Sequence, residues 1–75
     1  MNNTVKIGDT VMWRGDFGRG RPEPVKVVGM ELTETPRAKY GVSVDEALWS
    51  SVKTNRVIFT LDNNKWAYGE QISPN

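Results

Sequence analysis

The chain has 75 residues, of which ten are Lys or Arg and nine are Asp or Glu, so its formal net charge is +1. Folding at this length buries only about 60–65% of the surface that the unfolded chain exposes, so the core is thin and a large active-site cleft is not expected. The sequence contains neither cysteine nor histidine, which excludes disulfides and removes the commonest metal ligand and general base. We therefore expect one globular domain over residues 1–75, stabilised by apolar packing.

Closely spaced Gly, Pro and Asn residues divide the chain into short segments, which favours strands over helices. Residues 10–13 predict a strand with Val11 and Trp13 on its inner face. Residues 25–33 predict a second strand, in which the apolar side chains change from odd to even positions next to Gly29. A β-bulge at that point would absorb one residue, bend the strand and return both halves to the same interior.

A C-terminal hairpin is predicted from the alternating segments 57–61 and 66–68. If Asn63 and Asn64 form a two-residue turn between them, Trp66 and Tyr68 face the interior. A turn over 69–71 and a last short strand at 72–73 follow. The residues expected to be buried are Val11, Val27, Met30, Leu32, Val57, Phe59, Leu61 and Ile72.

Residues 43–53 admit two interpretations. Ser43 and Glu46 have the spacing of a capping box, and apolar residues recur every four positions, which suits a short helical segment. An extended connector that packs Trp49 against the sheet explains the same residues equally well. The predicted fold class is thus all-β, as a strongly bent antiparallel barrel of about five strands, with this segment left open.

The order of these segments resembles that of small SH3-like barrels of the KOW and Tudor type. The opening Gly8-Asp9-Thr10-Val11 and the closing Gly69-Glu70-Gln71-Ile72 carry the likeness, the latter where such barrels place a one-turn helix before the last strand. The chain is also similar in style to uncharacterised small bacterial or prophage proteins. The resemblance covers about 45 residues; residues 35–55 have no counterpart, and neither a Tudor aromatic cage nor a full KOW motif is present. It implies binding of RNA, DNA or a peptide rather than catalysis.

Catalytic and metal sites are not expected. Without His or Cys, an activated Ser or Thr would need a Lys base or paired carboxylates, and Asp45 and Glu46 are neighbours that point in different directions. Asp62-Asn63-Asn64 begins like a calcium loop, but Trp66 stands where a ligand should be. We expect a non-enzyme with no cofactor and no metal. The chain shows no apolar signal region and no membrane span, so a soluble, cytoplasmic monomer is the default.

The most distinctive segment is Arg14 to Pro22, RGDFGRGRP. Its RGD tripeptide matches an adhesion motif that requires extracellular display, and its RGRP tetrapeptide matches a minor-groove AT hook but lacks basic flanks. Three of the five arginines lie within these residues, on a glycine-rich loop expected to join two strands and to be flexible. Their guanidinium groups would contact phosphates, and loop aromatics would stack on bases. The candidate binding residues are Arg14, Phe17, Arg19, Arg21, Tyr40 and Trp49.

Three hypotheses remain open at this point. The chain is a nucleic-acid-binding barrel for DNA or RNA that uses the arginine loop, a protein or peptide adaptor with an apolar groove at Tyr40 and Trp49, or an accessory domain with a passive surface. A strong salt dependence of binding is the mark of the first, because phosphate contacts release counterions.

Overall fold

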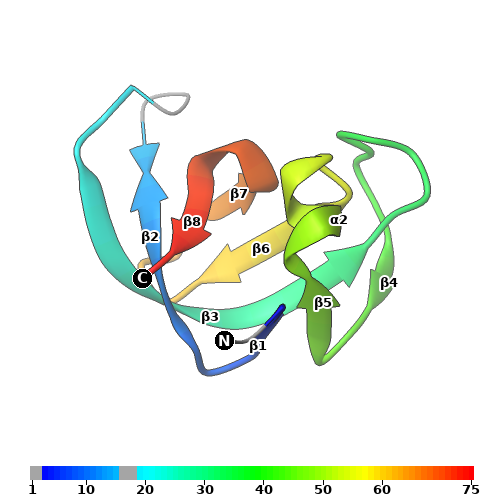
Figure 1. The fold of residues 1–75 in the computed structure, drawn as a ribbon, viewed down its shortest axis with the longest axis horizontal. Coiled ribbons are helices and arrows are strands. Elements are labelled where there is room, and N and C mark those ends of the chain that lie inside the picture. Colours follow the sequence, from blue (N-terminus) through cyan, green and yellow to red (C-terminus); the bar gives the residue numbers. More distant parts are fainter. Residues whose placement is uncertain (1–2, 16–18) are drawn as a thin grey trace.

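The computed structural model describes residues 3–15 and 19–75. In these two ranges the fold is mostly β, with antiparallel pairing in every described ladder, and it includes the short α-helix α2 and a one-turn 3-10 helix (Figure 1). The predicted all-β class is therefore confirmed. Within the described ranges, no helix has the length and apolar character needed to cross a membrane.

Six of the described strands form one sheet in the order β7-β6-β3-β2-β8, with β4 paired to β3, and β1 and β5 form a separate ladder. The strands are β1 (Thr4–Lys6), β2 (Thr10–Arg14), β3 (Pro22–Leu32), β4 (Val42–Ser43), β5 (Glu46–Leu48), β6 (Val57–Leu61), β7 (Trp66–Tyr68) and β8 (Ile72–Pro74). The helices described in full are α2 (Trp49–Lys53) and η1 (Gly69–Gln71). In the described residues no ladder joins β7 to β8, so the closed barrel that we expected is not observed.

Strand β3 curves along the whole molecule and pairs with β2, β4 and β6 (Figure 1). Its register against β6 shifts by one residue between Val27 and Gly29, which confirms the predicted bulge. The bulge turns Val28 into solvent and keeps both Val27 and Met30 in the core. The φ of Gly29 is not positive, so the bend does not depend on a left-handed glycine there.

The β6–β7 hairpin differs from the prediction by one residue. Thr60 pairs with Trp66 and Phe59 with Ala67, because the connection has three residues between Leu61 and Lys65 rather than a two-residue turn at Asn63-Asn64. The Leu61 amide donates to the Lys65 carbonyl at 2.9 Å. A one-residue change of register reverses every side chain of a strand. The prediction that Trp66 and Tyr68 face inward is therefore wrong, and the small side chain between them enters the core.

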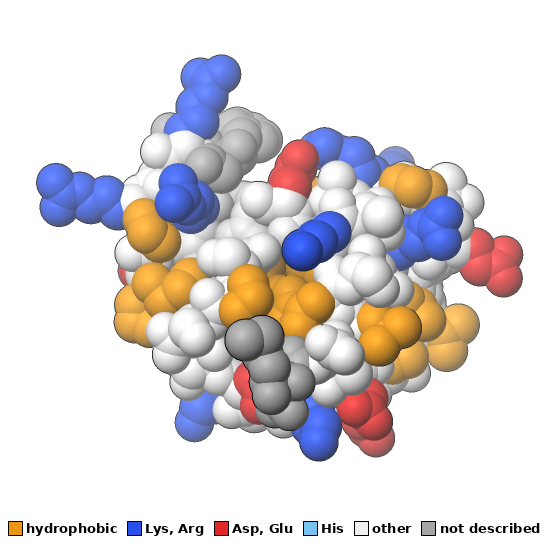
Figure 2. Space-filling model, viewed as in Figure 1, with side chains coloured by type: hydrophobic (Ala, Val, Ile, Leu, Met, Phe, Trp, Pro, Cys, Tyr) orange, Lys and Arg blue, Asp and Glu red, His pale blue; other side chains and the backbone are white. Residues whose placement is uncertain are grey.

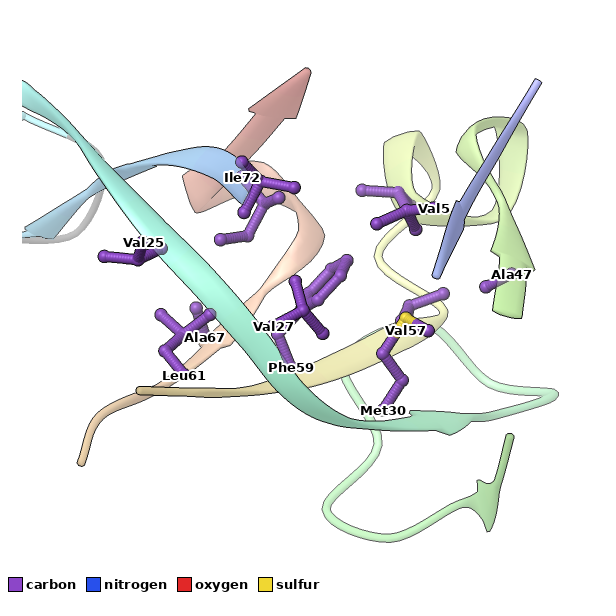
Figure 3. Close-up of a cluster of buried hydrophobic side chains, with 12 residues drawn as sticks. Val5, Val25, Val27, Met30, Ala47, Val57, Phe59, Leu61, Ala67 and Ile72 are labelled. Carbon is purple, nitrogen blue, oxygen red and sulfur yellow. The ribbon is translucent and has the colours of Figure 1, made fainter. Parts of the chain in front are cut away.

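The core lies between the curved sheet and the β1–β5 ladder (Figure 3). Seven of the eight residues predicted to be buried are buried; the exception is Leu32, which is 39% exposed because it ends β3 opposite the exposed Val42 of β4. Trp13 is partly buried and packs against the core, as predicted. The core residues are Val5, Val11, Val25, Val27, Met30, Ala47, Val52, Val57, Phe59, Leu61, Ala67 and Ile72.

Residues 43–53 combine the two interpretations. Only 49–53 are helical, as α2, while Glu46 lies in β5 and pairs with Lys6. The predicted capping box at Ser43 and Glu46 is therefore wrong: both residues are in strands, and no side chain caps α2. Pairing with β1, a partner some forty residues away in the sequence, overrides the local helical spacing. The last strand and the turn over 69–71 are present as predicted, with η1 as that turn.

Candidate functional site

The corrected hairpin register brings polar and aromatic side chains onto the outer face of the β3–β6–β7 sheet. Strand side chains alternate between faces, so Trp66 and Tyr68 lie on the face opposite Ala67. Trp66 pairs across the strands with Thr60, and Tyr68 pairs with Ile58, whose other neighbour is Glu31. Ile58 is only 8% exposed although it belongs to this outer face. The side chains around it therefore shield it from solvent.

Tyr68 is held in place by three contacts. Its ring meets that of Trp66 edge to face, with the centroids 5.2 Å apart and an interplanar angle of 88°. The guanidinium of Arg37 lies over the Tyr68 ring at 5.4 Å from the centroid, within the range of a cation–π contact. The Tyr68 hydroxyl donates to the Arg37 carbonyl oxygen at 3.3 Å. Trp66, which is 61% exposed, is thus left as the freely accessible ring of the pair.

Arg37 is fixed by its own set of partners. Its Nη1 lies 2.9 Å from Glu70 Oε1 and donates to Oε2 at 3.0 Å, and its backbone N–H donates to the Asn55 carbonyl at 2.8 Å. Asn55 also accepts the Glu70 N–H on its Oδ1, at 2.8 Å. Arg37 and Asn55 both have positive φ, at 60° and 59°. A left-handed backbone costs a residue such as Arg about 1–2 kcal/mol, whereas Asn visits it more readily, so these contacts hold a strained Arg37 against η1.

Two hollows meet at Trp66 and Tyr68, which line both. The first, of about 360 Å³, lies between β7, η1 and Trp13 of β2, and we call it the Trp13 hollow. The second, of about 470 Å³, lies over the outer face of the sheet beside the loop that carries Tyr40, and we call it the Tyr40 hollow. Lys65 lines the first and Lys39 the second. We refer to Lys39, Tyr40, Lys65, Trp66 and Tyr68 together as the Trp66 face.

The predicted arginine loop lies next to the Trp13 hollow. It connects β2 to β3, as predicted, although β1 precedes both strands, and its ends are joined by a hydrogen bond from the Gly20 N–H to the Gly15 carbonyl at 2.9 Å. Gln71, which lines the Trp13 hollow, donates from Nε2 to the Arg14 carbonyl at 3.3 Å.

The three arginines predicted for this loop are exposed, although Arg14 is the last residue of β2 and pairs with Pro22. Arg14, Arg19 and Arg21 are each exposed to solvent. In Figure 2, Lys and Arg side chains project from the corner of the molecule that carries the β2–β3 connection in Figure 1. Phe17, the fourth candidate from this segment, lies outside the described residues.

The two remaining candidates are not brought together. Tyr40 is 83% exposed and lines the Tyr40 hollow. Trp49 begins α2, packs half-buried against the core, and lines separate hollows near Thr4 and Asn3. Of the hollows described here, Tyr40 and Trp49 line different ones, so within the described residues these two side chains do not form the shared apolar groove that we expected.

Sequence reasoning missed most of the Trp66 face. Trp66 and Tyr68 were assigned to the core, and Lys39 and Lys65 were not singled out. The two registers differ in the length of the hairpin loop. In the observed register the loop has three residues, and Asn64, the last of them, has a φ of 64°. Among residues 3–15 and 19–75, no group of three or more Asp or Glu side chains is placed to hold a metal ion.

No protein-family model matches this sequence, and no curated protein or solved structure matches it either. The geometry of the chain itself therefore carries the functional argument.

Proposed function

We propose that the chain is a non-catalytic binding module of the open SH3-like type, and that its Trp66 face binds single-stranded nucleic acid. The strand order β7-β6-β3-β2-β8, the bulge that bends β3, and the single turn of η1 before β8 support the fold assignment. The observation that carries the function is the exposed Trp66, which stands edge to face on an anchored Tyr68 between two hollows.

A large aromatic side chain in this setting needs an explanation. Trp66 leaves 61% of its surface in water on a chain whose core is otherwise small, and packing alone would favour its burial. Every base offers a flat π-face, so an exposed and pre-positioned ring binds single strands with little sequence preference, at about 1–3 kcal/mol per stacked base. The contact with Tyr68, which Arg37 anchors, positions the Trp66 ring before any ligand arrives, which lowers the ordering cost of binding.

The distribution of cations favours a polyanion over a neutral peptide. Six of the ten Lys and Arg residues line the two hollows, end β2 or lie in the β2–β3 connection, although the chain as a whole carries only +1. A strand whose bases stack at Trp66 can place its phosphates along this surface toward the arginine loop. Such phosphate contacts position the strand without specifying its sequence.

Fluorescence anisotropy with labelled single strands of about ten nucleotides tests the proposal, since single-strand sites span about 4–16 nucleotides. DNA and RNA strands of mixed sequence are compared with a duplex of the same length at about 50 mM salt, where electrostatic affinity is favoured. Trp66→Ala should weaken single-strand binding by about 1–3 kcal/mol, which is roughly 5- to 150-fold in Kd. Equal binding of DNA and RNA would indicate that the protein contacts only bases and phosphates. Tighter binding of RNA would indicate an additional contact to the 2′-hydroxyl group.

Trp49→Phe is the matched control, because Trp49 lines neither hollow of the Trp66 face, and it should leave Kd unchanged. If the wild-type protein binds neither DNA nor RNA under these conditions, the proposal is wrong. Binding of a proline-rich peptide that is abolished by Trp66→Ala would then assign the same face to an adaptor, since prolines also dock between aromatic side chains.

A further inference from the structure

The Tyr40 hollow is lined by one negatively charged and one positively charged side chain as well as by aromatic rings. The rings of Tyr40 and Trp66 line it, with the buried Ile58 below them, and the polar lining includes Glu31 and Lys39. A carboxylate beside a base-stacking surface repels phosphates. Glu31 therefore favours a ligand group that donates hydrogen bonds over one that carries negative charge.

Glu31 is held where such a group would meet it. It projects from β3 on the outer face, in the same cross-strand row as Ile58 and Tyr68. Its Oε1 accepts the Gly41 N–H at 3.0 Å, which fixes the carboxylate at the base of the Tyr40 loop. This one bond leaves further lone pairs on the carboxylate, since each oxygen can accept two hydrogen bonds.

The aromatic rings available for stacking here are those of Trp66 and Tyr40. Tyr68 already has Arg37 over its ring and the edge of Trp66 against it. Tyr40 is 83% exposed, so it can close over a base that lies on Trp66. Both rings line the same hollow as Glu31 and Lys39.

We propose that the Tyr40 hollow is a guanine subsite, an inference that rests on the proposed binding of single strands. Guanine is the base whose pairing edge presents two adjacent donors, N1–H and the N2 amino group, next to the O6 acceptor. Glu31 accepts from the two donors, and the Lys39 ammonium donates to O6. Uracil and thymine place acceptors on both sides of a single N–H, so their carbonyl oxygens repel the carboxylate. Cytosine and adenine each present one amino donor next to an acceptor.

The test uses oligothymidylates that carry one central guanine, inosine, adenine, cytosine or thymine, which avoids the folding of G-rich strands. The guanine strand should bind roughly 5- to 150-fold more tightly than the thymine strand, the discrimination of a good bidentate contact. Inosine lacks the N2 amino group but keeps N1–H and O6, so its strand should fall between these two.

Glu31→Gln is the decisive variant, because its amide oxygen still accepts the Gly41 N–H while its NH₂ group opposes guanine N1–H. It should bring the guanine and thymine strands to within about twofold of each other, with no loss of affinity for the thymine strand. Tyr40→Ala changes an exposed ring and should weaken the guanine strand while the amide NMR spectrum shows an unchanged fold.

Three results separate the possibilities. Equal binding of all five strands by the wild-type protein overturns the guanine subsite and leaves single-strand binding intact. A guanine preference that survives in Glu31→Gln also overturns it, because the carboxylate would then not read the base. Failure of every strand to bind overturns both the subsite and the proposed function.

Discussion

Replacing Ala67 by Leu tests the hairpin register on which the Trp66 face depends. Ala67 is fully buried and pairs with Phe59, which is also fully buried. The substitution adds three carbon atoms to a close-packed region, and overpacking of this kind destabilises proteins by typically 1–3 kcal/mol. If the hairpin had the two-residue turn instead, residue 67 would lie on the solvent side and the larger side chain would be tolerated.

Urea and thermal unfolding followed by far-UV circular dichroism measure the effect. In a domain of this size a loss of 1 kcal/mol lowers Tm by about 4–8 °C, so Ala67→Leu is expected to lower it by at least that amount. Thr60→Val is the matched control on the outer face of the same hairpin, where Thr60 is exposed, and it should change stability by less than about 0.5 kcal/mol. An Ala67→Leu protein as stable as the wild type would refute the register and the outward placement of Trp66 with it.

Phe59→Ala should lower the free energy of unfolding by about 3–5 kcal/mol, because Phe59 is fully buried in the core; a change below about 1 kcal/mol in the same urea assay would contradict that position. Gly69→Ala should cost about 3 kcal/mol or more, since its Cβ would clash with a backbone carbonyl of α2, and a soluble variant of wild-type stability would show that η1 is not docked there. Replacing both Arg19 and Arg21 with Ala should leave stability unchanged, weaken all strands about equally and reduce the salt slope of binding by about 0.7 per lost phosphate contact; Arg56→Ala is the control, and an unchanged slope in the double variant would remove the arginine loop from the interface.

The bulge in β3 could be predicted from the sequence, whereas the hairpin register could not. The bulge can be recognised from neighbouring residues alone. Val27 and Met30 can both face the interior only if a bulge inserts one extra residue between them. In the hairpin, Trp66, Ala67 and Tyr68 alternate in the same way in either register. The assumption that large aromatic residues face inward selects the wrong one, because the core has room only for the smallest of the three beside Phe59.

The segment between β3 and β6 shows a second limit. Its spacing fits a helix, but Ala47 is fixed by pairing with Val5, a contact that depends on where β1 lies. The same limit applies to the candidate site. Arg14, Arg19, Arg21 and Tyr40 could be chosen by composition and exposure, but Glu31 and Trp66 become neighbours only through the pairing of β3, β6 and β7.

The pairing of β2 with β8 has a consequence for how the protein is made. Val11 lies opposite Pro74, and Trp13 opposite Ile72, so the outer edge of β2 is covered only by a strand that follows it some sixty residues later in the chain. An unpaired strand edge is a template for contact with other chains, and pairings between distant segments form slowly. A chain emerging from the ribosome would therefore expose the edge of β2 until Ile72–Pro74 have left the exit tunnel, so the sheet can be completed only after β8 is available to pair.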